Sequence, residues 1–195
     1  MRAAHAEFLL IDNSNSFTKF ALASRTALVA TRKLRTRDLD SGSLSRTLRG
    51  WRFDSVVMCS VVPEKGALLA THLRAHPFLA VNARTRLGIG IEYPKPRTIG
   101  ADRLANAVSA THFYGAPVVV VDFGTAVTFD IISRDRNYIG GVIAPGLRGR
   151  AGRRPSSSNE VERKSRRSGR TWVRADQRPE AGRAIAASRS RSRAS

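Results

Sequence analysis

The sequence is poor in the residues that build disulfide frameworks and membrane spans. Its 195 residues include a single cysteine, Cys59. One cysteine cannot form an internal disulfide framework, and its place in the apolar run 56–62 favours a small buried hydrophobic residue. Only the short apolar stretch 8–11 precedes Asp12, which is too little for the core of a signal peptide, and no apolar run approaches membrane-spanning length. We therefore expect a soluble cytoplasmic protein that is not exported and does not enter a membrane.

Acidic residues are also scarce, and unevenly so. The sequence holds 34 Lys and Arg against 15 Asp and Glu, a net charge of +19. Residues 1–147 carry 19 basic and 11 acidic residues, or +8, whereas residues 148–195 carry 15 and 4, or +11. Arg and Ser dominate this last segment, which has no periodic apolar face, so we expect a disordered basic tail. The arginines of this tail could bind nucleic-acid phosphates, which is one function that the composition allows. Because stacking aromatics are nearly absent there, such binding would be nonspecific and salt-sensitive.

Several familiar catalytic motifs are missing. The sequence has no Walker-type Gly-x-x-x-x-Gly-Lys-Ser/Thr, and the pair in Gly88-Ile89-Gly90 lacks the third glycine of a dinucleotide fingerprint. Nothing suggests a Ser-His-Asp nucleophile system. The histidines show no metal-site spacing with cysteine or carboxylates, so structural or surface roles are favoured for all four, which are His5, His72, His76 and His112.

The apolar pattern that is present predicts an α/β protein. Residues 7–11, 17–23 and 27–34 are separated by turn-forming residues and predict an antiparallel meander. Strand-like and helix-like segments then alternate, which is typical of α/β architecture. The further expected strands are 55–62, 78–81, 117–121, 127–132 and 138–144; the expected helices are 39–51, 67–73 and 102–114; and 83–99 is expected to be a loop.

Two of the expected turns are short, acidic and similar. Asp12-Asn13-Ser14-Asn15-Ser16 and Asp122-Phe123-Gly124-Thr125 each lie between two strand-like runs. In such a turn successive backbone N–H groups can converge on phosphate oxygens, and the carboxylate can hold a cation or its hydration shell. Ordinary hairpin turns are the alternative explanation for either turn alone. Their occurrence twice in equivalent contexts favours a nucleotide-dependent phosphotransferase.

Two further residues fit phosphoryl transfer, although each has a structural explanation. Lys19 follows the first turn, where its ammonium could reach a phosphate or could simply be solvated. Asp102 opens an expected helix, where it could only complement the helix dipole, with Arg103 as its surface neighbour. Beside a substrate hydroxyl, Asp102 could instead accept the proton that leaves during transfer.

An ordered series of motifs over about residues 7–147 carries a family resemblance. The motifs are Asp12 to Lys19, Tyr93, Gly100-Ala101-Asp102-Arg103 with its continuation Leu104-Ala105-Asn106-Ala107, Asp122-Phe123-Gly124-Thr125-Ala126, and Gly140-Gly141-Val142-Ile143-Ala144-Pro145-Gly146. In this order the chain resembles the type III pantothenate kinases, which belong to the actin, sugar kinase and heat-shock ATPase superfamily. The series is far more specific than any single motif.

The resemblance implies a fold, a reaction and partners. The fold would be two ribonuclease-H-like lobes. The reaction would be ATP-dependent phosphorylation of pantothenate, the first step of coenzyme A synthesis, with Mg²⁺ and a monovalent cation, potassium or ammonium. The family works as a cytoplasmic homodimer.

The resemblance also implies site residues, by matching position. Asp102 would be the proton acceptor, and Asp122 would hold the monovalent cation. The residues implied for ATP are Asp12, Asn13, Ser14, Asn15, Ser16, Phe17, Thr18, Lys19 and Thr125, and those implied for pantothenate are Tyr93, Gly100, Ala101, Asp102 and Arg103.

The chain departs from the family pattern in two places. The first turn usually reads Asp-x-Gly-Asn-Thr/Ser, and here Ser14 replaces the glycine. After Leu147 the Arg/Ser-rich tail stands where the family continues its second lobe, which we interpret as a frameshifted or degraded reading of the gene. We expect a first lobe at 7–115, an incomplete second lobe at 116–147 and a tail at 148–195, with low or absent turnover. A catalytically inactive, kinase-like regulatory protein is the alternative.

Overall fold

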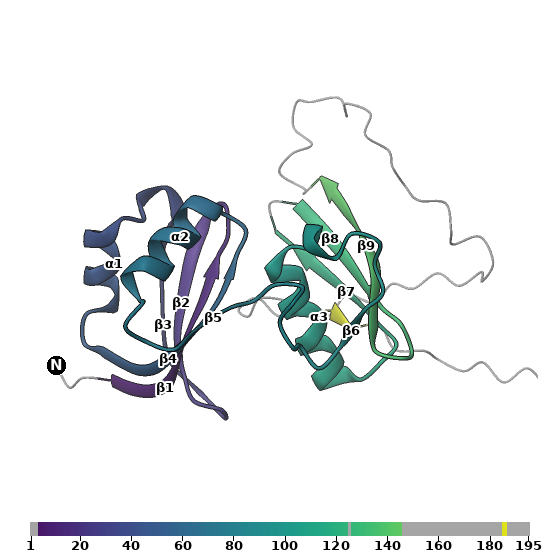
Figure 1. Cartoon of the computed structure of the whole chain (residues 1–195), viewed down its shortest axis with the longest axis horizontal. Coiled ribbons are helices and arrows are strands. Elements are labelled where there is room, and N and C mark those ends of the chain that lie inside the picture. Colours follow the sequence, from purple (N-terminus) through teal and green to yellow (C-terminus); the bar gives the residue numbers. More distant parts are fainter. Residues whose placement is uncertain (1–3, 125, 146–184, 187–195) are drawn as a thin grey trace, which may run out of the picture. The chain divides into compact units, whose positions relative to one another are not determined.

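The computed structural model describes residues 4–124, 126–145 and 185–186, and the chain divides into two compact units (Figure 1). Unit 1 consists of the described residues of Met1–Thr85 together with Arg97–Ala105. Unit 2 consists of Arg86–Pro96 and the described residues from Asn106 onward. We describe each unit by itself.

Unit 1 is built on a five-stranded mixed sheet in the order β3-β2-β1-β4-β5. The first three strands form an antiparallel meander, and β4 and β5 run parallel to β1. The carboxyl ends of β1, β4 and β5 therefore meet at one edge of the sheet. The elements of this unit are β1 (Ala4–Asn13), β2 (Phe17–Ala23), β3 (Leu28–Arg35), the 3₁₀ helix η1 (Thr36–Asp38), α1 (Ser41–Leu48), β4 (Trp51–Ser60), α2 (Pro63–His72), β5 (Phe78–Ala80) and the 3₁₀ helix η2 (Pro96–Thr98), whose first residue belongs to unit 2.

Helices α1 and α2 cover the same face of this sheet. Leu44 of α1 and Leu69 of α2 are fully buried in one core with alternate residues of the strands, such as Leu9 and Phe20. The pattern follows from the period of two along a strand, which sends every second side chain to the helix-covered face. Asp40 begins α1 with a capping box, in which its carboxylate accepts from the Ser43 amide.

Unit 2 is a second mixed sheet, in the order β10-β7-β8-β9-β6. Strands β7, β8 and β9 are antiparallel neighbours, and β6 joins β9 in parallel. Figure 1 shows α3 lying against this sheet. The elements are β6 (Gly90–Ile91), α3 (Ala101–Tyr114), which begins in unit 1, β7 (Val118–Phe123), β8 (Ala126–Ile132), β9 (Asn137–Pro145) and β10 (Ile185–Ala186).

The core of unit 2 holds a polar pair among apolar side chains. Val120, Ile132 and Tyr138 are buried, and the Tyr138 hydroxyl donates to the buried carboxylate of Asp130 at 2.7 Å. Helix α3 ends at Gly115, whose φ of 79° places it in the left-handed region that glycine adopts without strain. The Gly115 amide donates to the Thr111 carbonyl and completes the helix end.

The structure confirms the α/β fold, and it corrects the sequence analysis in three places. Trp51, which the apolar spacing assigned to the first helix, begins β4 instead, because Gly50 at φ 78° reverses the chain after α1. Helix α2 begins at Pro63 rather than at 67, and Pro63 occupies a first-turn position, where its missing N–H needs no partner. The expected loop 83–99 contains β6 and η2.

The expected lobe boundary at residue 115 stays a prediction, although the compact units divide within α3. The expected disordered tail, 148–195, lies outside the described residues except for β10.

Candidate active site

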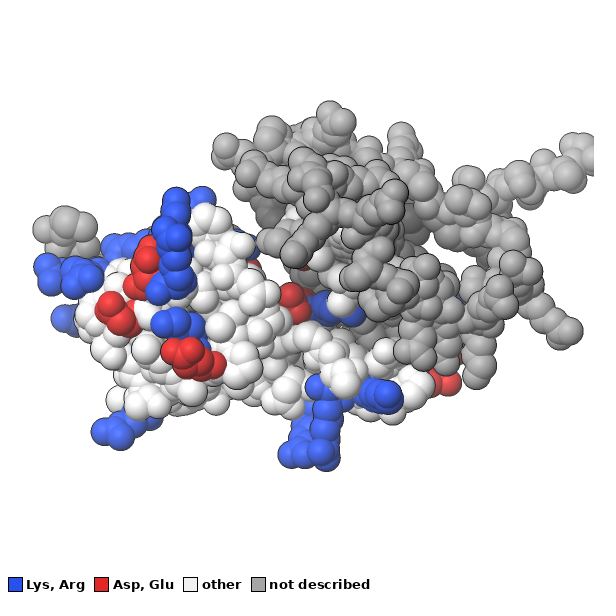
Figure 2. Space-filling model, turned by 90° about the horizontal axis from the view of Figure 1, so that it is seen from above, with Lys and Arg blue, Asp and Glu red and all other residues white. Residues whose placement is uncertain are grey.

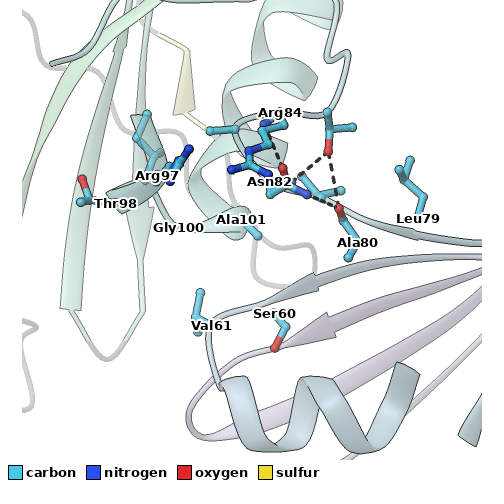
Figure 3. Close-up of a pocket in the computed structure, with 14 residues that line it drawn as sticks. Ser60, Val61, Leu79, Ala80, Asn82, Arg84, Arg97, Thr98, Gly100 and Ala101 are labelled. Carbon is cyan, nitrogen blue, oxygen red and sulfur yellow. Dashed lines mark hydrogen bonds between the residues drawn. The ribbon is translucent and has the colours of Figure 1, made fainter. Parts of the chain in front are cut away.

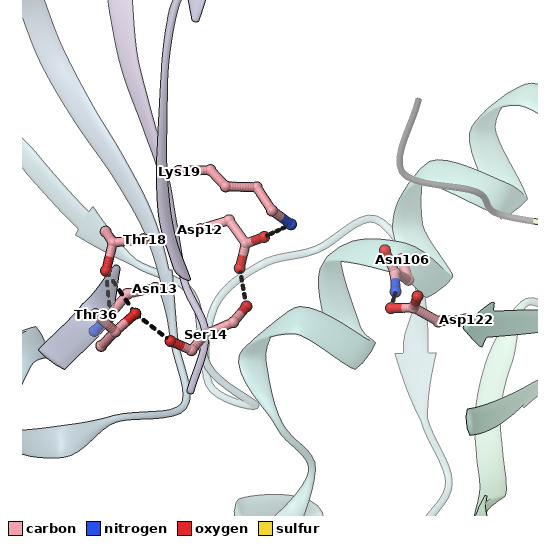
Figure 4. Close-up of polar contacts among 8 residues, drawn as sticks. All are labelled: Asp12, Asn13, Ser14, Thr18, Lys19, Thr36, Asn106 and Asp122. Carbon is pink, nitrogen blue, oxygen red and sulfur yellow. Dashed lines mark hydrogen bonds and ion pairs between the residues drawn. The ribbon is translucent and has the colours of Figure 1, made fainter. Parts of the chain in front are cut away.

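The first acidic turn holds its carboxylate between two side chains (Figure 4). Asp12, near the end of β1, lies opposite Lys19 of β2 in the antiparallel register. The Lys19 ammonium donates to Asp12 Oδ2 at 2.8 Å, and the Ser14 hydroxyl donates to Asp12 Oδ1 at 2.6 Å. The Lys19 and Asp12 side chains are 59% and 40% exposed, so the pair is accessible to a ligand. The turn thus presents an oriented carboxylate and a cation on one face of the sheet.

The other face of the same turn is a buried polar network. Asn13, Thr18 and Thr36 are almost fully buried. The Thr18 hydroxyl donates to Asn13 Oδ1 at 3.0 Å, and the Thr36 hydroxyl donates to the Ser14 carbonyl at 2.6 Å. Asn13 also donates to Ser60 Oγ of β4 at 2.8 Å. This network fixes the turn to both neighbouring strands.

The two faces divide the residues implied for ATP. The side chains of Asp12, Ser14, Asn15, Ser16, Phe17 and Lys19 are exposed or half-buried, whereas Asn13 and Thr18 point into unit 1. The division follows from the alternation of side chains along strands. Direct contact of each residue with phosphate stays a prediction. Thr125 lies outside the described residues.

Ser14 replaces the usual glycine of the turn without backbone strain. Among the described non-glycine residues only Arg136 has a positive φ, so Ser14 adopts an ordinary backbone conformation. The Ser14 side chain also contributes a contact, because its hydroxyl donates to the Asp12 carboxylate.

Asp102 is placed by the first turn of α3. It is the second residue of the helix, and its Oδ1 accepts from the Arg103 amide at 2.8 Å. A methyl group on the preceding Gly100 would collide with the Asp102 carboxylate. Glycine at 100 therefore leaves the space that this carboxylate occupies.

Cys59 reports that Asp12 and Asp102 approach the same point. Cys59 lies on β4 directly opposite Asp12 of β1. Burial, followed by the negative charges of Asp12 and Asp102, raises the pKa of the Cys59 thiol to about 11. Both carboxylates are therefore near enough to disfavour the thiolate. Geometry agrees, since Asp12 pairs with Cys59, and Gly100, which adjoins the Asp102 carboxylate, lies beside Val61 at the carboxyl end of β4.

In unit 2, the second acidic turn lies beside α3. Asn106 Nδ2 of α3 donates to Asp122 Oδ2 at 3.2 Å (Figure 4). The Gly124 amide donates to the Ala126 carbonyl at 2.9 Å and closes the turn.

Tyr93, implied for pantothenate, belongs to the same unit. Its ring lies edge-on to that of Tyr138 with centroids 6.2 Å apart, and it approaches Gly140 closely. A methyl group at position 140 would make only an ordinary contact with this ring, at 3.9 Å, and the φ of 150° is what favours glycine there.

Comparison with known proteins identifies the family. A sequence model of the type III pantothenate kinase family matches residues 8–153. The chain belongs to this family. A type III pantothenate kinase of Akkermansia muciniphila is 53% identical over 141 residues, which are 72% of this chain and 58% of that protein. That of Methylacidiphilum infernorum is 41% identical over 143 residues, 71% of this chain and 51% of that protein. The chain thus spans between half and three fifths of the length of these two relatives.

Some described residues of this member of the type III pantothenate kinase family hold the site in place although the sequence motifs did not predict such a role. Thr36 and Ser60 hold the first turn although neither belongs to a motif, and no local signal marks them. Asn106 lies within the motif series, but no role was predicted for it, although it follows Asp102 by one helical turn on the same side of α3. Its amide positions the Asp122 carboxylate.

The described residues hold no cluster of three or more His, Cys, Asp or Glu side chains that could bind a metal ion by themselves. Asp122 suits a different kind of site. Its carboxylate is an oxygen ligand of the type that hard cations prefer, and Asn106 is hydrogen-bonded to only one of its oxygens. A monovalent cation here would need further oxygen ligands, for which backbone carbonyls or a bound substrate are suitable.

An open cavity of about 850 Å³ lies within unit 1, at the carboxyl ends of β4 and β5 (Figure 3). Gly100 and Ala101, from the segment implied for pantothenate, form part of its wall. Arg84 and Arg97 lie on the same wall. The cavity therefore adjoins the start of α3, where Asp102 is placed.

The described residues visible in Figure 2 give the nucleic-acid alternative no special support. On the face seen in Figure 2, Lys and Arg side chains are interspersed with Asp and Glu rather than gathered in one stripe. The tail, on which that alternative rests, lies outside the described residues. None of the helices in the described part of the chain has the length and apolar character of a membrane span.

Proposed function

We propose that this chain catalyses ATP-dependent phosphorylation of pantothenate to 4′-phosphopantothenate. One observation carries the proposal: Asp12, from a phosphate-type turn, lies opposite Cys59 of β4, and Gly100, which adjoins the Asp102 carboxylate at the start of α3, lies beside Val61 just after β4. Phosphoryl transfer to an alcohol needs a cation-binding carboxylate near the phosphates and a second carboxylate near the hydroxyl. Family membership supplies the identity of the alcohol.

In this proposal each carboxylate has its own task. Asp102 accepts the proton of the pantothenate hydroxyl as its oxygen bonds to the γ-phosphorus of ATP and the bond to ADP breaks. Asp12 would hold Mg²⁺ through its hydration shell, and Mg²⁺ supplies charge neutralisation for the phosphates. The backbone amides of the turn residues Asn15 and Ser16, with Lys19, would cradle phosphate oxygens.

The remaining assignments extend the same proposal. Tyr93 and Gly100 to Arg103 would bind pantothenate, Thr125 would contact ATP, and Asp122 would hold potassium or ammonium. A cytoplasmic homodimer is proposed by analogy with the family. The bond from Asn106 to Asp122 supports the cation assignment, since it orients the carboxylate.

The experiment separates binding from turnover. The full chain is incubated with ATP, Mg²⁺, K⁺ and pantothenate, and the phosphorylated product is measured by mass spectrometry, while ATP binding is measured by calorimetry. We expect slow product formation that requires pantothenate and is lost in Asp102→Asn, with ATP binding retained. Asp54→Asn is the matched control, because Asp54 is exposed and pairs only with His5 among the described residues.

Two other outcomes would count against the proposal. ATP binding without product would support the inactive, kinase-like alternative. Full activity in Asp102→Asn would remove this aspartate from the role of base.

A further inference from the structure

Three charged side chains form a row across unit 1 beside the first turn. In the strand register, Asp12 of β1 lies opposite Lys19 of β2, and Lys19 lies opposite Lys33 of β3. Directly opposite residues share one face of a sheet, with Cβ atoms about 4.5–5.5 Å apart. The row therefore places one carboxylate and two ammonium groups on the face that carries the exposed side of the turn.

The positive charges of this row are not balanced within the described residues. The Asp12 carboxylate is bonded to Lys19 at 2.8 Å, and no described carboxylate pairs with Lys33. Like charges directly opposite one another destabilise an antiparallel pair. An anion beside Lys19 and Lys33 would remove that repulsion.

The Lys33 side chain lies over the ring of Phe17. Its ammonium lies 5.4 Å from the centroid of the Phe17 ring, a cation–π distance. Phe17 is the first residue of β2 after the turn, so the ammonium leans from its place opposite Lys19 toward the turn. Phe17 directly follows Asn15 and Ser16, the exposed turn residues whose amides the proposed function assigns to phosphate.

We propose that Lys33 is a second cation for the phosphate chain of the nucleotide, supplied by β3 and held over Phe17. The inference rests on the proposed function, and it adds a residue outside every motif of the sequence. Lysine suits this role because it binds phosphate as a flexible point charge. Its ligand is the polyphosphate rather than the base, so its contribution grows with the number of phosphates.

The experiment measures binding of ATP, ADP, AMP and inorganic tripolyphosphate to the full chain by calorimetry at fixed salt. We expect Lys33→Gln to weaken the binding of ATP and tripolyphosphate about five- to tenfold, as loss of a partly exposed charged contact would. The binding of AMP should weaken less than about twofold. Lys33→Arg keeps the charge and should stay within about twofold of the wild type.

Arg52→Gln is the matched control for loss of one positive charge. Arg52 is exposed at the opposite end of β4, seven residues from Cys59, or about 23 Å at the rise of a strand. Equal affinities for Lys33→Gln and Arg52→Gln, or an equal loss for AMP and ATP, would overturn the inference.

Failure of this inference and failure of the proposed function are distinguishable. Suppose that Lys33→Gln lowers the affinity for tripolyphosphate and the wild type forms no phosphorylated pantothenate. The phosphate site is then supported and the kinase proposal is refuted. If the wild type forms product and Lys33→Gln binds ATP unchanged, the inference falls alone. A wild type that binds neither ATP nor tripolyphosphate would refute both.

Discussion

The single thiol of the chain can test where the two site carboxylates lie. Burial, then Asp12, then Asp102 raise the pKa of Cys59 to about 11 from its ordinary 9.0. The substitutions Asp12→Asn and Asp102→Asn remove one charge each and keep the size of the side chain. Each should lower the pKa of the thiol, because the thiolate is then repelled by one negative charge fewer.

The expected rates follow from the fraction of thiolate, which is the reactive form. At pH 8 a cysteine with its ordinary pKa of 9.0 is about one-tenth thiolate, whereas Cys59 is about one-thousandth thiolate. The native chain should therefore react with iodoacetamide about 100-fold more slowly than the urea-unfolded chain, and burial slows it further. Each aspartate substitution should raise the native rate about two- to fivefold, since burial is the largest cause of the shift and remains.

Intact-mass spectrometry provides the assay, because the chain contains one cysteine and each adduct reports Cys59 alone. The native rate should keep rising with pH up to about 11, where the unfolded chain has already levelled off near 9. The variant Asp54→Asn should react like the wild type. Cys59 is half-buried rather than fully buried as the sequence predicted, so a native rate equal to the unfolded rate would refute this partial burial. An Asp102→Asn rate equal to that of Asp54→Asn would refute the approach of Asp102 to β4.

Two further predictions concern the placement of the site. Gly100→Ala should lower kcat about tenfold or more while ATP affinity stays within about twofold, because the added methyl displaces the Asp102 carboxylate by a fraction of an ångström or more. Steady-state kinetics measures kcat and calorimetry measures the ATP affinity. An unchanged kcat would contradict the prediction. Thr36→Val should lower the free energy of unfolding by about 1–3 kcal/mol, because the part-buried Ser14 carbonyl loses its donor and the buried Thr18 hydroxyl loses its contact with the Thr36 hydroxyl. In urea titrations Thr31→Val, at an exposed position of the preceding strand β3, should change this free energy by less than about 0.5 kcal/mol, and equal effects of the two substitutions would refute the network.

Local signals were sufficient for the elements that carry the proposed chemistry. The first turn could be predicted because Asp12 to Ser16 are turn-forming residues between two apolar runs, and α3 because its apolar spacing stops at Gly115. Both depend on neighbours within a few positions in the chain. The start of β4 could not be predicted in this way. Trp51 continues the apolar spacing of α1, and only its burial in the sheet core, with the reversal at Gly50, makes it a strand residue.

The contacts that hold the site together depend on strand register, which no local pattern contains. Thr36 lies 22 positions from Ser14, and Lys33 lies 14 positions from Lys19, yet both pairs meet because β2 and β3 are antiparallel with one particular alignment. A shift of that alignment by a single residue would send Lys33 to the opposite face of the sheet. The turn residues are readable from the sequence, whereas the cation beside them is readable only once the register is known.

The same geometry limits what the first motif can do as a unit. Because side chains alternate along β1 and β2, Asp12 and Lys19 face outward while Asn13 and Thr18 face inward. A ligand at the turn can therefore meet only half of these side chains directly. The inward-facing side chains act on the ligand through the position of the backbone amides, since they tie the turn to η1 and β4. Substitution of the outward-facing Asp12 or Lys19 should thus weaken nucleotide binding in a folded protein. Substitution of the inward-facing Asn13 or Thr18 should first lower the stability of the turn that presents those amides.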